Sequence, residues 1–564
     1  MDAPAFYPSE AEAPSRCGTN DRRVIWSYYL ALAFYASVVI VSLRNYVPIW
    51  DGWAFYHDCF MNAANTGDCS CLGHVAFLPT ALYGAVAYVF PYNFTAFAFV
   101  NLTMGLVACY ALGRSLSHLF PSRPWLSHVA SSLLLLNPVM FAQVIQPSLD
   151  YPLAVLTALV VAAFLAGDLL IATLIGLLMT STKEPGIMIY GVFLIAFMLV
   201  TLWERARTRD FKDAARYAVK HSYTILPLLG FVLYSIFLGL HGGSFGKQSL
   251  SLEDVAEKLL VLFPDPDLLL AQMASLFVLN FSWLLTAAFV ASIAALIIRP
   301  GWLSPPARQW LVVVSASLAA GCYLHTRVLL WNNPRYVLPL FVFLLTGFVV
   351  AVSQLHARFP RLAAAAVIAC LPLFIASQFF TIDPLSKRTF RTFDFGQHEM
   401  LSMGGFRRLP LNWRHAYYGR DQQVYNLQFV KFSELAEQAV REFGLDAHYV
   451  TGPVFTGWTD FQNYDEHSLR RSMRPDARKI DFFPIEQASD DYRNGKRQGG
   501  FVFLAFPNVI NDDTLHVLRK RYESLSERTV SCGGYSIQAY EFGSPKSSEA
   551  RSDEAGKSGS PIDP

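Results

Sequence analysis

The sequence is dominated by apolar blocks of about 17 to 25 residues, which recur from residue 24 to residue 380. A helix of that length crosses the roughly 30 Å hydrocarbon layer of a membrane. Hydrophobic residues make up 53% of the chain and charged residues only 16%, against about 45–50% and about 25% in soluble domains. The blocks therefore predict a polytopic α-helical membrane protein and exclude a purely soluble, fibrous or disordered chain.

The net charge and the cysteine content exclude further classes of protein. The net charge is +2, and no basic patch is interleaved with aromatic residues, so we expect no nucleic-acid partner. The 8 cysteines among 564 residues are too few for a disulfide scaffold. Residues 1–23 are polar and lack the apolar core of a cleavable signal peptide. Arg22 and Arg23 precede the first block, which predicts a cytoplasmic N-terminal tail and a signal anchor.

We expect about eleven transmembrane helices within a membrane module at 24–380. They fall at 24–43, 94–112, 126–145, 151–167, 168–180, 186–203, 222–240, 274–298, 310–328, 335–353 and 362–380. Residues 75–91 are apolar but short and contain a proline, so they either span or lie in the interface. If they crossed, the basic run at 205–220 would lie outside, against the positive-inside rule. We therefore expect 75–91 to be interfacial or re-entrant.

The composition changes after residue 380. Residues 384–545 are charged and mixed, with helical periodicity at 431–443 and 513–526. Strand-like runs occur at 448–455, 501–506 and 536–542. This alternation predicts a small α/β domain, which lies on the extracytoplasmic side because it follows an odd number of spans. Residues 546–564 have the composition of a disordered tail.

With eleven spans, the polar groups that interrupt the apolar sequence come to one external face. These groups are Asp51, Asp150, Lys183 with Glu184, and Arg335. Ionisable groups beside or inside spans are costly and tend to mark functional sites. Their convergence from distant parts of the sequence predicts a site at this face.

Asp51 lies in the external loop 44–74, between Trp50 and Trp53. Tryptophans favour the membrane interface, where a carboxylate is partly desolvated and its basicity increases. Such a carboxylate suits a general base acting on a hydroxyl. The alternative is a turn aspartate before Gly52.

The other three groups each have a structural alternative. Asp150 either belongs to the site or caps the helix that follows it. Lys183 either binds a phosphate or snorkels at the interface beside Glu184. Arg335 follows Asn333 and Pro334, which are typical of a helix start, and it either attracts an anion there or anchors the interface.

Three cysteines share the first external loop. In an oxidising compartment, a disulfide from Cys59 to Cys69 or Cys71 is the simpler interpretation. The alternative is a metal site with His57, Asp58, Asp68 and His74, so the metal stays unknown.

These elements together resemble the type C glycosyltransferase (GT-C) superfamily, in its protein O-mannosyltransferase-like and lipid A aminoarabinose transferase-like branch. The resemblance rests on Asp51, on the Asp-x-Pro-Leu run at 150–153, on the Thr-Lys-x-Pro turn at 182–185, and on the Pro-Arg-Tyr-x-Leu-Pro run at 334–339. It covers roughly residues 20–380. The chain departs from the family at Asp51-Gly52, where protein mannosyltransferases have an Asp-Glu pair, and at Glu184.

The resemblance implies transfer of a sugar from a polyprenyl-phosphate donor to a lipid, glycan or protein acceptor at the external face. It implies Asp51 as the base, Asp150 as support for the acceptor site, and Lys183 and Arg335 as ligands of the donor phosphate. Glu184, His57 and Asp58 are weaker candidates for the acceptor or a cation. The sequence identifies no definite cofactor, and a divalent cation stays open.

Two other classes compete with an enzyme. A transporter or lipid flippase of cell-envelope precursors would use the polar groups as a pathway, but such proteins often show internal repeats, and this sequence has none. A structural subunit would use its external domain to bind a partner. The resemblance favours the inner (plasma) membrane, with the endoplasmic reticulum membrane as the alternative.

Overall fold

The computed structural model describes most of the apolar part of the chain and several segments beyond it. The described residues are 19–42, 52, 55–69, 71, 76–91, 93–240, 276–277, 280–328, 334–378, 399–400, 409–410, 450–451, 501–505, 512–532 and 535–546. The chain divides into two structural units. The first comprises 1–44, 51–400 and 408–426, and the second comprises 45–50, 401–407 and 427–564.

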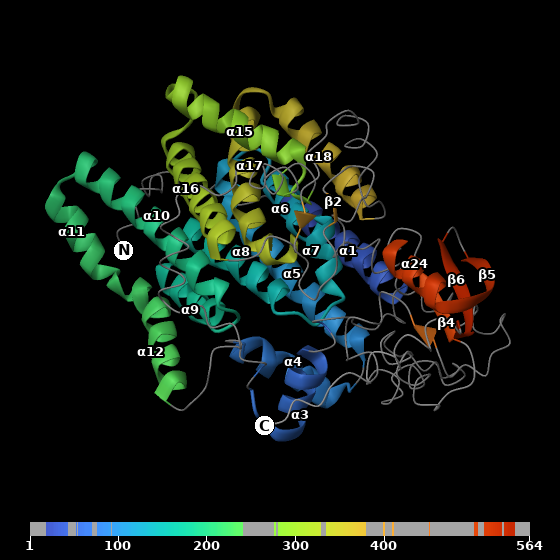
Figure 1. Cartoon of the computed structure of the whole chain (residues 1–564). Helices are drawn as coiled ribbons and strands as arrows, with labels where there is room; N and C mark the ends of the chain where they lie inside the picture. The colour runs from blue at the N-terminus through green and yellow to red at the C-terminus, as the bar shows by residue number, and fades with distance from the viewer. Residues whose placement is uncertain are drawn as a thin grey trace. The chain divides into compact units, whose positions relative to one another are not determined.

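The first unit is a bundle of helices (Figure 1). Its helices are α1 (Thr19–Ser42), α3 (Asn62–Thr66), α4 (Phe77–Val89), α5 (Phe94–Leu116), α6 (Trp125–Leu136), α7 (Pro138–Val144), α8 (Asp150–Ala166), α9 (Leu169–Thr180), α10 (Pro185–Thr208), α11 (Phe211–Lys220), α12 (Leu226–Leu240), α15 (Trp283–Ile298), α16 (Pro305–Val328), α17 (Leu338–Arg358) and α18 (Pro360–Ser377). A π-helix, η2 (Phe55–Met61), and short 3-10 helices, η3 (Ser117–Leu119), η4 (Ser222–Ile225), η6 (Pro300–Trp302) and η7 (Pro334–Val337), join them. A two-residue ladder pairs β1 (Glu399–Met400) with β2 (Leu409–Pro410).

Five described helices are long and apolar enough to cross a membrane. They are Asn20–Ser42, Phe94–Leu119, Pro185–Thr208, Arg335–Arg358 and Pro360–Ser377, and each coincides with an expected span. They make the chain a multi-pass membrane protein. The other expected spans correspond to helices that are shorter, less apolar or bent, so the number eleven remains a prediction. Helix α1 begins at Thr19, and the extent of the cytoplasmic tail remains a prediction.

The span expected at 126–145 is not one straight helix. Helices α6 and α7 meet at 67°, because Pro138 cannot continue the hydrogen-bond ladder of α6. Asn137 caps α7 by accepting hydrogen bonds from the Val139 and Met140 amides. Its own amide group donates to the Asn280 carbonyl at 2.8 Å. The bend brings the end of α7 to the turn that precedes α8.

The interior of the bundle is built around α8 and α17. Nearly every residue of both helices is buried, from Asp150 to Leu165 and from Leu338 to Ser353. Their sequences are apolar on all sides, as expected of helices enclosed by other helices. Both begin at the same end of the bundle, because Arg335 of η7, which leads into α17, lies 3.3 Å from Asp150, the first residue of α8.

The second unit has a four-stranded sheet in the order β3-β4-β6-β5. Its strands are β3 (Val450–Thr451), β4 (Phe501–Ala505), β5 (Tyr522–Cys532) and β6 (Tyr535–Pro545), and α24 (Asp512–Arg521) packs beside β5. β3 and β4 are parallel, whereas β4–β6 and β6–β5 are antiparallel. The three expected strands correspond to β3, β4 and β6.

One expectation for this unit is wrong. The helix expected at 513–526 ends at Arg521, and residues 522–526 belong to β5. Tyr522 and Ser524 pair with β6, so cross-strand packing overrides the local helical periodicity. The expected helix at 431–443 and the tail at 547–564 lie outside the described residues.

Candidate functional site

Three polar segments meet where α8, α10 and α17 begin. Asp150 is the first residue of α8, and Lys183 lies in the turn between α9 and α10. Arg335 lies in η7, directly before α17. The structure thus brings together three of the four groups that the sequence placed at one face.

These three side chains form a buried ion cluster. Nζ of Lys183 lies 2.6 Å from Oδ1 of Asp150, and Nε of Arg335 lies 3.3 Å from Oδ2 of the same carboxylate. The side chains of Lys183, Asp150 and Arg335 are 11%, 3% and 5% exposed. Asp150 does not cap α8 with its side chain, so the capping alternative is wrong. Its carboxylate instead holds two cations together.

Tyr336 forms an aromatic platform for both cations. Lys183 Nζ lies 4.5 Å and Arg335 Cζ 5.2 Å from the centre of its ring. A cation at such a distance over a tyrosine ring is stabilised electrostatically. The fully buried His325 of α16 lies behind this segment, with Nε2 3.3 Å from the Tyr336 carbonyl oxygen and Nδ1 2.8 Å from the Gly321 carbonyl oxygen. His325 therefore connects α16 to η7.

The environment of Lys183 sets its charge. Burial is the largest single influence and lowers its pKa, as does the charge of Arg335, but the charge of Asp150, the contribution of Tyr336 and the hydrogen bond to Asp150 together outweigh them. The result is a Lys183 pKa above the ordinary 10.5. Lys183 is therefore a permanent cation at physiological pH.

A polar network fixes the start of α8. The buried Asn101 of α5 donates to the carbonyl oxygens of Val144 (3.0 Å) and Gln146 (3.2 Å). Tyr151 donates to the Asn101 carbonyl oxygen at 2.8 Å. Tyr83 of α4 donates to the Asn101 side chain. Because Tyr151 follows Asp150 directly, this network also positions the carboxylate.

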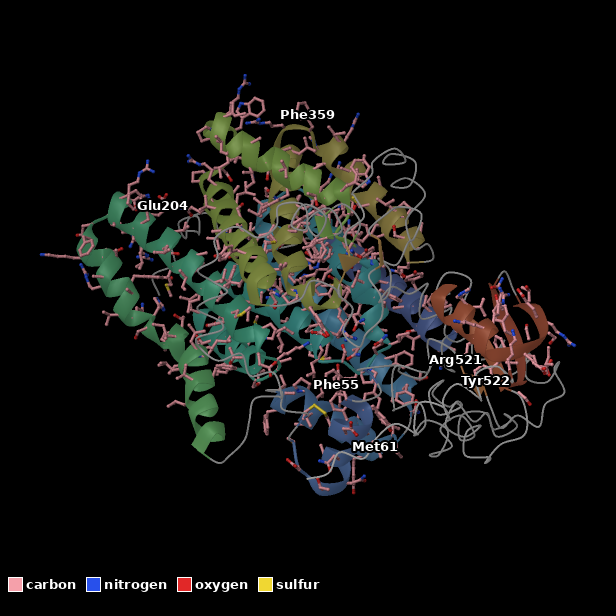
Figure 2. All side chains as sticks on the ribbon, in the orientation of Figure 1. Phe55, Met61, Glu204, Phe359, Arg521 and Tyr522 are labelled. Carbon is pink, nitrogen blue, oxygen red and sulfur yellow. A yellow bond between two sulfur atoms is a disulfide. The ribbon has the colours of Figure 1, made fainter. Side chains whose placement is uncertain are left out.

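The loop between α1 and α4 contains a disulfide between Cys59 and Cys71 (Figure 2). This agrees with one of the two expected pairings, and Cys69 is a free thiol. The loop leads into α4, whose Leu78 amide donates to the Ser181 carbonyl oxygen at 3.2 Å. The start of α4 is therefore anchored to the turn that carries Lys183.

The remaining candidates have different positions. Asp51 lies outside the described residues, as does the side chain of His57. Asp58 is exposed on η2. Glu184 is half-buried at the N-cap position of α10, and its side chain does not cap the helix. Their roles remain predictions.

A metal ion does not fit the described cluster. Among the residues that the structure describes, no group of three or more His, Cys, Asp or Glu side chains could hold one. The single carboxylate of the cluster is already paired with two cations, whereas divalent cations such as Mg²⁺ and Ca²⁺ require several oxygen ligands.

Asn101, Tyr336 and His325 were not predicted as site residues. His325 carried a signal, because an ionisable residue within an apolar helical block marks a site more often than chance. The signal for Asn101 was weaker, since the partners of a single asparagine in an apolar helix are not known until the fold is known.

No family model matches this sequence, and no curated protein matches it. Solved structures are similar to it, among them the following two. ArnT from Cupriavidus metallidurans, in the apo state, has 13% identity and a TM-score of 0.45, covering 91% of this chain and 97% of ArnT. The archaeal oligosaccharyltransferase AglB from Archaeoglobus fulgidus, in complex with an inhibitory peptide and a dolichol-phosphate, has 12% identity and a TM-score of 0.37, covering 86% of this chain and 74% of AglB.

Proposed function

We propose that this chain is a membrane glycosyltransferase that transfers a sugar from a polyprenyl-phosphate-linked donor to an acceptor at the extracytoplasmic face. The observation that carries the proposal is the buried cluster of Asp150, Lys183 and Arg335. The order of the sequence motifs that resemble the GT-C superfamily supports the same reaction. The inner (plasma) membrane is the proposed location.

The charge of the cluster suits a phosphate. Its three side chains carry two positive charges and one negative charge. The three side chains lie at or directly before the N-termini of α8, α10 and α17, and each helix contributes a positive dipole end. Such an excess of buried positive charge favours an anionic ligand. The donor phosphate, delivered in the membrane by its lipid tail, is the anion that we propose.

The proposed reaction is an inverting displacement. The acceptor hydroxyl loses its proton to a base, and its oxygen forms a bond to the anomeric carbon of the sugar. The bond from that carbon to the phosphate oxygen breaks, and polyprenyl phosphate leaves with the bonding electrons. Lys183 and Arg335 stabilise the negative charge that develops on the leaving phosphate, and Asp51 is the proposed base.

The described contacts favour a positioning role for Asp150. Its carboxylate contacts both cations, so it holds them side by side. The hydrogen bond from Leu78 to Ser181 supports the proximity of the first loop, which carries Asp51, to the phosphate site.

A transfer assay tests this function. The full chain is reconstituted in nanodiscs with a panel of polyprenyl-phosphate sugars and a membrane extract as the acceptor source. We expect release of polyprenyl phosphate from at least one donor, dependent on the acceptor. Asp51→Asn should abolish the release, whereas Asp68→Asn, which changes an exposed carboxylate of the same loop, should not.

Two results would contradict the proposal. If no donor releases polyprenyl phosphate, the glycosyltransferase assignment is wrong. If the wild-type chain in vesicles moves a polyprenyl-phosphate sugar intact across the bilayer without release, the chain is a flippase.

A further inference from the structure

Helix α11 presents two parallel stripes on its surface. Phe211, Ala215 and Val219 repeat every four residues, and all are exposed. Lys212, Arg216 and Lys220 repeat at the same spacing one position later, and all are exposed. At about 100° per residue, an apolar stripe therefore runs directly beside a basic one.

The opposite side of α11 is fixed to α10. Ala214 and Tyr217 are buried, and the guanidinium of Arg205 lies 4.1 Å from the centre of the Tyr217 ring. Arg205 also binds Asp213 at 2.8 Å. Asp213, the one acidic residue within the helix, is thus directed at α10, and the exposed charge of α11 is basic.

The exposure of the apolar stripe is unusual for a surface in water. Phe211 is 79% exposed and Val219 is 75% exposed. Helix α11 follows directly on α10, which is long and apolar enough to cross a membrane, and Figure 1 shows α11 at the edge of the helical unit. Figure 2 labels Glu204 near this end of α10. The stripes are therefore located where a helix leaves the hydrocarbon layer.

We propose that the exposed face of α11 binds anionic phospholipid headgroups. A basic stripe beside an apolar one is the pattern by which a helix enters the interface of a charged membrane. The basic residues contact lipid phosphates, and Phe211 and Val219 enter the upper acyl region. The positive charge of the basic stripe favours this ligand, because the negative surface potential of a membrane with anionic lipids attracts polybasic segments. The predicted topology places α11 at the cytoplasmic leaflet.

Hydrogen exchange of the full chain in nanodiscs tests the proposal. Lipid that binds the folded helix suppresses its local opening. We expect the amides of α11 to exchange about tenfold more slowly with phosphatidylglycerol present than in phosphatidylcholine alone. High salt should reduce the difference. The amides of α10 provide an internal control for folding.

Variants identify the contacts. Replacing Lys212, Arg216 and Lys220 together by Gln should remove the difference between the two bilayers, and Phe211→Ser with Val219→Ser should reduce it. The matched control replaces Arg519, Lys520 and Arg521 of α24 by Gln, which changes the charge equally on exposed residues and should leave α11 protected.

Equal exchange in both bilayers would overturn the proposal. The proposal would also be overturned if the α24 control variant removed the difference between the two bilayers. That result would mean that the bilayer attracts the total charge of the chain and not the basic stripe of α11. If the protection of the α11 amides depended on the number of chains per nanodisc, the exposed face of α11 would bind a second copy of the chain instead of lipid.

Discussion

Lys183 and Asp150, 33 positions apart in the sequence, are joined by a hydrogen-bonded ion pair of 2.6 Å inside the helical unit. Removing one partner of a buried pair leaves an uncompensated charge, which costs about 3–5 kcal/mol. Arg335 shares the same carboxylate. The stability of the site therefore depends on Asp150 more than on either cation.

We expect Asp150→Asn to be the most destabilising single change at the site, because it leaves two cations side by side. Lys183→Met leaves Asp150 paired with Arg335 and should cost less. The double variant should be more stable than the sum of the single effects indicates, by about 0.5–3 kcal/mol. Thermal unfolding in detergent measures all three. Strictly additive effects would show that the pair contributes nothing.

Gly186 is required by the turn that carries Lys183. A Cβ atom at this position would collide with the carbonyl oxygen of Met179 in the preceding helix. We expect Gly186→Ala to destabilise the chain by about 1–3 kcal/mol and to reduce transfer by displacing Lys183. Gly191→Ala in the same helix is the matched control, since its Cβ would meet only Leu228 at 3.6 Å. If the two variants behave alike, the turn is not constrained.

The Cys59–Cys71 disulfide closes a short loop, with a sequence separation of 12. A bridge of this size contributes about 3 kcal/mol. Replacing both cysteines by Ser should lower the melting temperature and expose the first loop to chymotrypsin, which cleaves after aromatic residues such as Phe55, Tyr56 and Phe60. Cys69→Ser should behave as wild type. Peptide mapping without reduction should find Cys69 as the free thiol, and a Cys59–Cys69 bridge would contradict the structure.

The raised pKa of Lys183 predicts how binding depends on pH. Its charged form contributes fully below the ordinary 10.5, and the contribution is lost only as the pH rises through the higher folded value. Affinity for polyprenyl phosphate should therefore stay constant from about pH 7 to about pH 9. Lys183→His introduces a group with a pKa of about 6.5, so this variant should lose affinity over that range. If the wild type lost affinity over the same pH range, a group other than Lys183 would be the cation that binds the phosphate.

Much of the site was predictable because charges are rare in apolar sequence. Asp150, Lys183 and Arg335 are conspicuous for that reason, and topology alone placed them at one face. Their pairing was not predictable, since the sequence does not give the distances between three residues that are far apart in the chain, or the orientation of their side chains. The role of Asp150 was equally hidden, because an aspartate before Tyr-Pro also fits a helix cap.

The fold was predictable where apolar blocks are long and failed at local breaks. Asn137-Pro138 bends the expected span at 126–145, although the apolar pattern runs through it. Tyr522 and Ser524 follow a helical pattern but pair with β6. In both places a hydrogen-bond requirement, which hydrophobic periodicity does not describe, decides the structure.

Binding of polyprenyl phosphate by the full chain in nanodiscs tests the central claim most directly. The wild type and Asp51→Asn should bind alike, since Asp51 acts on the acceptor. Lys183→Met and Arg335→Met should each bind about 10- to 100-fold more weakly, because each loses a charge-assisted contact to the phosphate. Arg361→Met, an exposed arginine outside the cluster, is the control. Equal affinity in all five proteins would contradict the assignment of this cluster as the donor phosphate site.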